Sequence, residues 1–296
     1  MRQLEFYLVD VFTEQQFGGN QLAVFPNPGN LNDYQMQAIA REFNFSETTF
    51  IYPPEDPAHD ARIRIFTPQK EVPMAGHPTI GTAHLYLNEL KKNPINDNFL
   101  IYEEGIGPIK IEFEKNASSY QKITMHQPLP SFGPVVKNKV MVAEMLSLKE
   151  TDLLEKYPCE CVSCGNRFLF VPLSSLEAVK KCNFKVDIAA QIPEADMVYV
   201  FSLETAGNAT THGRMFAPLY GVPEDPATGS ASGPLGCYLV RHQLSDGNGI
   251  LCEQGFEIGR PSVIQVRIIQ KQGAISDVQV SGSTIVSGKG QFLLHG

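Results

Sequence analysis

The chain has 296 residues and a formal net charge of −8, with 43% hydrophobic and 19% charged residues. This length suggests two domains of ordinary size, and the composition is too apolar for a disordered chain. The acidic charge argues against nucleic acid and against an anionic membrane as the main partner. No run of 18 apolar residues occurs, so we expect no transmembrane helix.

The N-terminus leads directly into a strand-like pattern. Residues 1–5 lack the apolar stretch of a secretory signal peptide, and residues 4–12 are typical of a strand. We therefore expect a cytoplasmic protein whose six cysteines are reduced.

Three of the cysteines, Cys159, Cys161 and Cys164, lie close enough in sequence to suggest a metal site. Their spacing is not a paired C-x-x-C framework. Residues 157–162 also alternate like a strand, which points Cys159 and Cys161 to the same face. The pattern favours buried structural thiols and no metal, with a metal site as the alternative.

The first half of the chain predicts strands and two helices. Asn30 or Asn32 can cap a helix that ends near Glu42, and Pro78 favours a second helix over about 77–91. The expected strands of this half are 4–12, 21–25, 48–52, 61–66, 98–103, 106–114 and 120–126.

A cluster of breakers, Pro128, Pro130, Gly133 and Pro134, then predicts a domain boundary. We expect an N-terminal domain over 1–130 and a C-terminal domain over 131–282, with a final strand at about 283–296 that can return to the first domain. The second half is expected to contain a helical region at about 138–155, strands at 159–164, 167–172, 196–203 and 210–216, a helix at 229–242, and strands from about 250 onward.

Two loops of small residues, 74–81 and 224–233, lie near the middle of each half. Each leads into an apolar helical pattern and places polar groups at the expected helix start: His77 in one, Asp225 and Ser230 in the other. A helix N-terminus presents unpaired N–H groups and the positive end of the helix dipole. Two such termini facing each other would form a preformed cage for an anionic small molecule.

The similarity of the two loops indicates that the two halves are diverged copies. The sequence predicts an α+β fold of two similar domains, each a rolled, mostly antiparallel sheet around a central apolar helix. Function would then lie in the inter-domain cleft.

The chain resembles the PhzF-like, phenazine-biosynthesis-type isomerase family, which has the diaminopimelate epimerase fold. The motifs that carry the resemblance run nearly end to end, in this order: 9–12, 19–20, 23–25, 46–50, 76–81, 214–218 and 224–231. The resemblance implies a cofactor- and metal-independent isomerase that moves a proton between carbons of a small carboxylate-bearing substrate. It also implies a homodimer.

The resemblance assigns catalytic roles to Glu47, His77 and Asp225, with Glu47 as the acid and base that moves the proton. Burial between Phe45 and Phe50 would raise the pKa of Glu47 toward neutrality. A carboxylate beside an imidazolium would form a coupled proton relay. The bland alternatives are a strand-end carboxylate for Glu47, a helix cap for His77 and a turn-forming role for Asp225.

The substrate-binding positions implied by the resemblance are Asn20, Ser46, Gly76, Gly229 and Ser230. Ser230 could instead serve only as a helix N-cap. Neither small-residue loop contains a cysteine, which argues against a two-thiol racemase or epimerase. The remaining alternative is a catalytically silent protein of the same fold that binds a small molecule or a partner.

Overall fold

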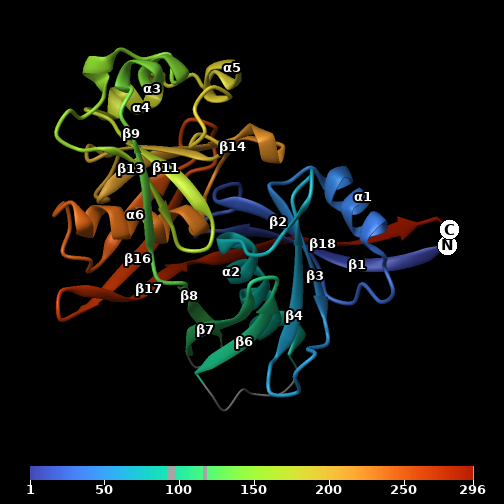
Figure 1. The fold of residues 1–296 in the computed structure, drawn as a ribbon. Helices are drawn as coiled ribbons and strands as arrows, with labels where there is room; N and C mark the ends of the chain where they lie inside the picture. The colour runs from blue at the N-terminus through green and yellow to red at the C-terminus, as the bar shows by residue number, and fades with distance from the viewer. Residues whose placement is uncertain (92–97, 116–118, 296) are drawn as a thin grey trace. The chain divides into compact units, whose positions relative to one another are not determined.

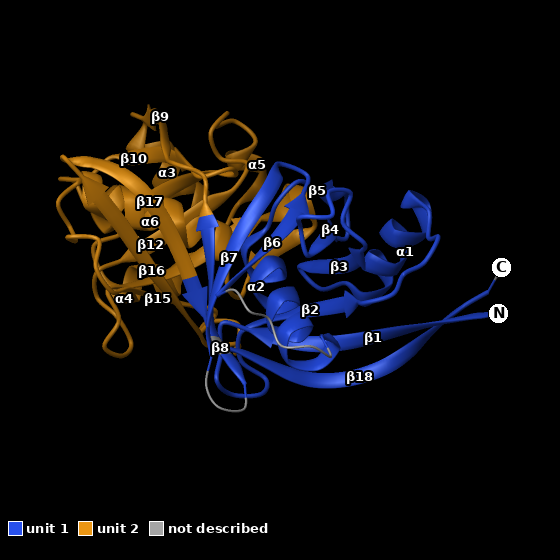
Figure 2. Ribbon diagram, turned by 90° about the horizontal axis from the view of Figure 1, so that it is seen from below, with its two compact units in different colours: residues 1–126, 281–296 blue, residues 127–280 orange. Residues whose placement is uncertain are grey.

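The computed structural model describes residues 1–91, 98–115 and 119–295, and Figure 1 shows the course of the chain. The chain divides into two compact units, coloured separately in Figure 2: unit 1 contains residues 1–126 and 281–296, and unit 2 contains residues 127–280. The sequence places the corresponding limits at residues 130 and 282. Within the described ranges, none of the helices combines the length and apolarity needed to cross a bilayer.

Unit 1 contains one surface helix, α1 (Asp33–Phe43), and one buried helix, α2 (Gly76–Leu85), which continues as a π-helical turn over Tyr86–Leu90. Its strands are β1 (Arg2–Val11), β2 (Asn20–Phe25), β3 (Glu47–Tyr52), β4 (Ala61–Phe66), β5 (Glu71–Val72), β6 (Phe99–Glu104), β7 (Gly107–Lys115), most of β8 (Tyr120–Gln127), and β18 (Thr284–Leu294).

The sheet of unit 1 is mostly antiparallel. β18 pairs with β1 along its whole length, from Arg2↔Leu294 to Val11↔Thr284. Antiparallel pairs also join β1 to β2, β3 to β4, β4 to β5, and β6 to β7. Two pairs are parallel, β2 with β3 and β4 with β6. Residue 296 of the expected final strand lies outside the described residues.

Helix α2 is the central helix of unit 1, and it packs against β1, β2, β3 and β18. Every residue of α2 except His84 is buried, because its side chains are small or apolar all round. A Cβ atom at Gly81 would lie 2.6 Å from Val11 Cγ2 and 2.9 Å from Leu22 Cδ2. The glycine therefore allows the helix to approach the sheet this closely.

Unit 2 contains α3 (Lys139–Met145), α4 (Leu176–Lys181), α5 (Val186–Ala189) and the central helix α6 (Gly229–Arg241). Its strands are β9 (Ser131–Val136), β10 (Cys159–Ser163), β11 (Arg167–Pro172), β12 (Val198–Ser202), β13 (Thr211–Ala217), β14 (Val222–Asp225), β15 (Ile250–Gln254), β16 (Ser262–Lys271) and most of β17 (Ala274–Gly282).

Unit 2 repeats the pairing order of unit 1. β9 pairs with β10 and β10 with β11 antiparallel, as β18 does with β1 and β1 with β2. β11 runs parallel to β12, as β2 does to β3, and β13 runs parallel to β15, as β4 does to β6. The short β14 precedes α6 as the short β5 precedes α2. The predicted fold class, two similar α+β domains around central helices, is confirmed.

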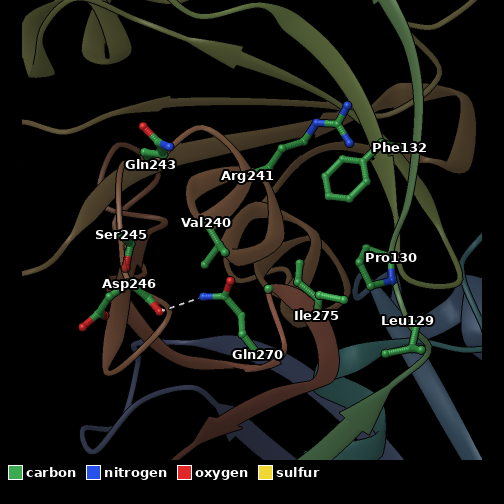
Figure 3. Close-up of a pocket in the computed structure, with 12 residues that line it drawn as sticks. Leu129, Pro130, Phe132, Val240, Arg241, Gln243, Ser245, Asp246, Gln270 and Ile275 are labelled. Carbon is green, nitrogen blue, oxygen red and sulfur yellow. Dashed lines mark hydrogen bonds between the residues drawn. The ribbon is translucent and has the colours of Figure 1, made fainter.

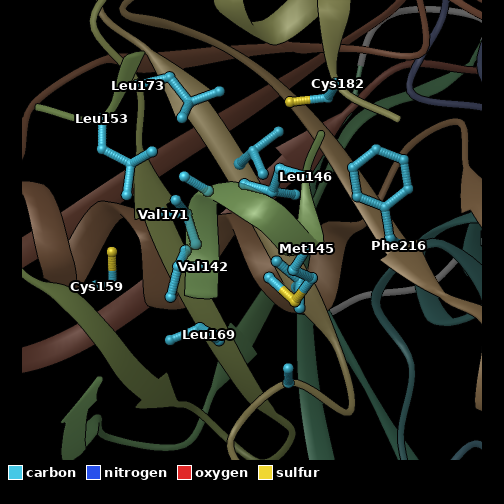
Figure 4. Packing of buried hydrophobic residues seen from close by; sticks show 14 of the residues in the cluster. Val142, Met145, Leu146, Leu153, Cys159, Leu169, Val171, Leu173, Cys182 and Phe216 are labelled. Carbon is cyan, nitrogen blue, oxygen red and sulfur yellow. The ribbon is translucent and has the colours of Figure 1, made fainter. Parts of the chain in front are cut away.

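The core of unit 2 includes a cluster of aliphatic side chains between α3 and strands β10, β11 and β12 (Figure 4). Val142, Met145 and Leu146 pack there against Leu169 and Val171. These contacts bury the apolar face of a helix only seven residues long, which could not be stable alone.

The expected helical region at about 138–155 is divided in the structure: α3 ends at Met145, Ser147 adopts a left-handed φ of 58°, and a short 3-10 helix follows over Glu150–Asp152. Residues 131–136 form strand β9, although the sequence suggests only a boundary there. The β9–β10 register shifts between Glu160 and Val162, opposite Pro134, which places the proline at an irregularity where its missing N–H is tolerated.

Candidate active site

The first turn of α2 brings three predicted site residues of unit 1 together. Asn20 and Glu47 are the first residues of the parallel strands β2 and β3, so both side chains start from the same edge of the sheet. His77 is the second residue of α2. Its Nδ1 lies 3.2 Å from Asn20 Nδ2 and 3.4 Å from Glu47 Oε2.

The helix start itself carries no capping side chain. Ala75 occupies the N-cap position with extended backbone, so the alternative of His77 as a cap does not hold. Gly76 begins the helix and is buried. No side-chain cap therefore accepts from the N–H groups of this turn. The positive end of the helix dipole is likewise not compensated by a capping side chain.

His77 is neutral in this setting. Its side chain is 3% exposed, and this burial lowers its pKa to about 3, with a hydrogen bond to the Gln21 backbone partly opposing the shift. Desolvation by burial thus favours the neutral ring over the imidazolium that a coupled proton relay would need. Nδ1 is the ring nitrogen that faces both the Asn20 amide and the Glu47 carboxyl group.

Glu47 remains reachable from solvent, because 17% of its side chain is exposed. Ser46, just before it, is also only partly buried. Glu47 Oε2 lies 3.4 Å from Nδ1 of this buried ring, and a neutral ring supplies no positive charge to hold the carboxyl group in its ionised form. This arrangement suits a carboxyl group that gains and loses a proton.

In unit 2, Asp225 ends β14 and is held by its own loop. The Thr228 hydroxyl donates to Asp225 Oδ2 over 2.5 Å. Gln254, on β15, donates from Nε2 to the Asp225 carbonyl at 2.6 Å and to Thr228 Oγ1 at 2.9 Å, and its Oε1 accepts from Thr228 N at 3.1 Å. Asp225 is 4% exposed, so these hydrogen bonds fix a buried carboxylate.

Helix α6 starts next to this carboxylate. Thr228 is its N-cap residue but makes no side-chain cap, and Gly229 and Ser230 form its first two positions. Ser230 therefore does not act as the N-cap. The Gln127 amide donates to the Gly229 carbonyl over 3.0 Å, and a Cβ at Gly233 would lie 2.0 Å from Gln127 Oε1. Because Gly233 has no side chain, the Gln127 side chain can lie against α6 and donate to the Gly229 carbonyl in its first turn.

Sequence reasoning missed Gln254 and the role of Thr228. Thr228 lies inside the 224–233 motif, and its position three residues after Asp225 is the only signal that could have indicated a contact. Gln254 lies 26 residues beyond Thr228 in an ordinary strand, and nothing local marks it. The expectation that the residues of both units share a cleft between the domains stays a prediction.

The cysteines form no metal centre in the described part of the chain, where no group of three or more His, Cys, Asp or Glu side chains is placed to hold a metal ion. Cys159 and Cys161 face the core of unit 2, and burial raises the pKa of each thiol to about 11. All six cysteines are buried free thiols outside both small-residue loops. A two-thiol mechanism therefore has no residues in these loops.

A cavity of about 880 Å³ lies within unit 2 (Figure 3). Arg241 packs its guanidinium 4.2 Å from the centre of the Phe132 ring at its rim, and Gln270 donates to the Asp246 carbonyl over 3.3 Å. None of the predicted site residues lines this cavity. Its polar groups include no closely paired acid and base, so the helix starts remain the candidate site.

Comparison with known proteins gives consistent matches along the chain. The sequence profile of the phenazine biosynthesis-like proteins matches residues 9–290. An uncharacterised isomerase from Clostridium acetobutylicum is 36% identical over 305 aligned residues, covering 100% of both chains. The trans-2,3-dihydro-3-hydroxyanthranilate isomerase of Pseudomonas chlororaphis is 36% identical over 291 residues, covering 98% of this chain and 99% of the relative.

Solved structures agree with these matches. A phenazine biosynthesis protein of the PhzF family from Bacillus anthracis has a TM-score of 0.89 at 26% identity and covers 99% of this chain and 100% of its own. A hydroxyproline epimerase from Agrobacterium vitis has a TM-score of 0.66 at 12% identity, covering 98% and 92%. The second likeness concerns the fold alone.

Proposed function

Because the chain belongs to the phenazine biosynthesis-like family and is thus an isomerase acting on a small molecule, we propose that Glu47 moves a proton between two carbon atoms of a carboxylate-bearing substrate. The alternative of a catalytically silent binding protein is set aside, since the relatives are named isomerases.

The observation that carries the proposal is the pairing of Glu47 with His77. A group that both removes and returns a proton must be reachable by the substrate and must be stable in both protonation states. Glu47 is partly exposed, and Oε2 lies 3.4 Å from Nδ1 of a buried, neutral imidazole. A neutral ring does not favour the ionised form of Glu47 as an imidazolium would, while exposure to solvent stabilises the carboxylate.

The relatives and the two helix starts support a proposal for the substrate class. A hydroxyanthranilate carries a ring carboxylate, and the Pseudomonas relative is named for isomerising a dihydro form of it. We propose a substrate of this chemical class, a cyclic carboxylate with an acidic C–H bond. The first turns of α2 and α6, at Gly76 and at Gly229 and Ser230, lack side-chain caps and supply N–H groups suited to a carboxylate or a developing enolate.

The remaining roles are supporting ones. Asn20 orients the His77 ring, and Ser46 lies beside the proposed base. Asp225, fixed by Thr228 and Gln254, would accept hydrogen bonds from polar substituents of the substrate. The homodimer and the cytoplasmic location stay predictions.

The test replaces Glu47 with Gln, which keeps size and hydrogen bonding but removes the base. With trans-2,3-dihydro-3-hydroxyanthranilate and related cyclic carboxylates as probes, incorporation of solvent deuterium should fall by a factor of about 10² to 10⁴. Substrate binding should survive in this variant.

Ser230→Ala is the matched contrast, because it changes a proposed binding group and leaves the base intact. It should weaken substrate binding more than it slows the chemical step. Deuterium incorporation at the wild-type rate in Glu47→Gln would show that Glu47 is not the base.

A further inference from the structure

Glu104, the last residue of β6, is a buried acid in unit 1 that the proposed mechanism does not use. Side chains alternate along this strand, and Leu100, Tyr102 and Glu104 all face the core. Only 7% of Glu104 is exposed. A carboxyl group in such a place must be hydrogen-bonded, paired with a cation or uncharged.

The carboxyl group meets α2 two residues after His77. Thr79 Oγ1 lies 2.5 Å from Glu104 Oε1 and 2.7 Å from the carbonyl oxygen of Ala75, the N-cap residue of α2. A threonine hydroxyl has one proton to donate, and a backbone carbonyl can only accept. If Thr79 donates to Ala75, then the proton in the short contact with Glu104 must come from Glu104.

We propose that Glu104 is a positioning residue for the candidate site: its neutral carboxyl group donates to Thr79, so that Thr79 can donate to Ala75 and fix the first turn of α2 that carries His77. The effect on catalysis rests on the proposed function, whereas the protonation state and the effect on the turn do not. An ionised Glu104 would instead accept the hydrogen bond from the Thr79 hydroxyl. The Ala75 carbonyl would then lose Thr79 as a donor.

The surroundings of Glu104 favour the neutral acid. Its Oε2 has no hydrogen-bond partner among the described residues. A bare carbonyl oxygen is less costly to bury there than one end of a carboxylate. Burial raises the pKa of Glu104 to about 8, and the Thr79 hydrogen bond only partly opposes this shift.

The ionisable groups on the elements around Glu104 supply no compensating charge. On β6, Glu103 turns to accept hydrogen bonds from the backbone of residues 55 and 56, and the pKa of Tyr102 is raised, chiefly by burial, so that its phenol carries no charge. On α2, His77 is neutral, and burial lowers the pKa of His84. The described residues place no Lys or Arg in an ion pair with Glu104.

The backbone beyond Glu104 is attached to the segment that leads into α2. Ile106 N donates to the Pro73 carbonyl over 3.2 Å, and a Cβ at Gly105 would lie 2.7 Å from Pro73 Cα. This close contact limits how far Glu104 can withdraw from Thr79. A change of charge on Glu104 must therefore be absorbed by the first turn of α2.

The first test compares the thermal stability of the full-length wild type and Glu104→Gln between pH 5 and pH 9. The amide of the variant still donates to Thr79 but does not titrate. Folding raises the pKa of Glu104, so its contribution to stability is greatest below the unfolded pKa and is lost as pH rises toward about 8. The difference between the thermal midpoint of the variant and that of the wild type should therefore shift in favour of the variant as pH rises over this range. Above about pH 8 the difference should stay constant.

Glu114→Gln, at an exposed position on β7, is the control and should follow the wild type. A gap between Glu104→Gln and the wild type that does not change with pH, or that changes below pH 5 only, would show that Glu104 is ionised in the folded protein and would overturn the inference.

The second test follows the ring signals of His77 by NMR in histidine-labelled protein, assigned with His77→Gln. In the wild type the signals should shift as Glu104 ionises near pH 8, and in Glu104→Gln this step should be absent. An unchanged step in the variant, or no step in either protein, would overturn the positioning role. Both readouts work without turnover, so a protein that isomerises none of the probes would contradict the proposed function and still test Glu104.

Discussion

The neutral state of His77 makes a quantitative prediction about acid sensitivity. The pKa of His77 is lowered from 6.5 to about 3 by burial, so the folded protein leaves the ring unprotonated where the unfolded chain protonates it. Below pH 6.5 the unfolded state binds a proton that the folded state does not bind. Stability is therefore lost as pH falls from 6.5 toward 3, at about 1.4 kcal/mol per pH unit.

The size of the effect at an accessible pH follows directly. At about pH 5 the His77 ring alone should cost about 2 kcal/mol of unfolding free energy relative to about pH 7.5. His77→Gln keeps a neutral polar side chain next to Asn20 and removes this titration. The wild type should lose about 2 kcal/mol more than the variant between these two pH values, whatever the variant's absolute stability.

Urea denaturation of both proteins at the two pH values measures this difference, and groups that titrate alike in both cancel. An NMR titration of the His77 ring gives an independent check, since its signals should show no step centred near pH 6.5, where a free histidine titrates, apart from the step expected from Glu104 near pH 8. Equal acid sensitivity of wild type and variant would show that folding leaves the pKa of His77 unchanged, which would refute the burial argument. A wild type that is less acid-sensitive than the variant would show that Glu47 holds the ring protonated.

Two further substitutions test the supports of the site. Gln254→Leu removes the amide that donates to the Asp225 carbonyl and to Thr228 Oγ1, so it should lower the free energy of unfolding by about 1–3 kcal/mol in urea denaturation. It should also raise KM more than it lowers kcat. An unchanged KM would count against a positioning role for this loop. Gly81→Ala places a Cβ 2.6 Å from a side-chain carbon of β1 and should lower the free energy of unfolding by about 1–3 kcal/mol. Gly288→Ala is the control: its nearest contact would be 3.4 Å, so the urea midpoint of unfolding should change little. Equal effects of the two substitutions would mean that α2 can move off the sheet.

The sequence predicted those elements whose signals are local. Asn32 caps α1 through a reciprocal pair of hydrogen bonds with Gln35, as its position before an apolar helical pattern indicates. Strand β4 matches its expected range because its alternation is regular. The start of α6 at Gly229 was predicted from the small residues at 229–233, which are all within the first turns of the helix.

The parts that failed depend on contacts between distant residues. The neutrality of His77 depends on burial by strands that lie far from it in sequence, so motif reasoning allowed an imidazolium. Gln254, which donates to the Asp225 backbone carbonyl, lies 29 residues away on β15. Glu104 lies at the end of an ordinary strand, and only the position of Thr79 in the folded unit, 2.5 Å from Glu104 Oε1, points to the positioning role that we propose for it.

The pairing of β18 with β1 has a consequence for synthesis on the ribosome. Unit 2 is one uninterrupted stretch of chain and can complete its sheet before translation ends, but unit 1 lacks the neighbour of its first strand until residues 284–294 emerge. The usual N-terminal-first order of cotranslational folding is thus reversed for its last step. Until then β1 is an open strand edge, a site at which nascent chains can pair wrongly with one another.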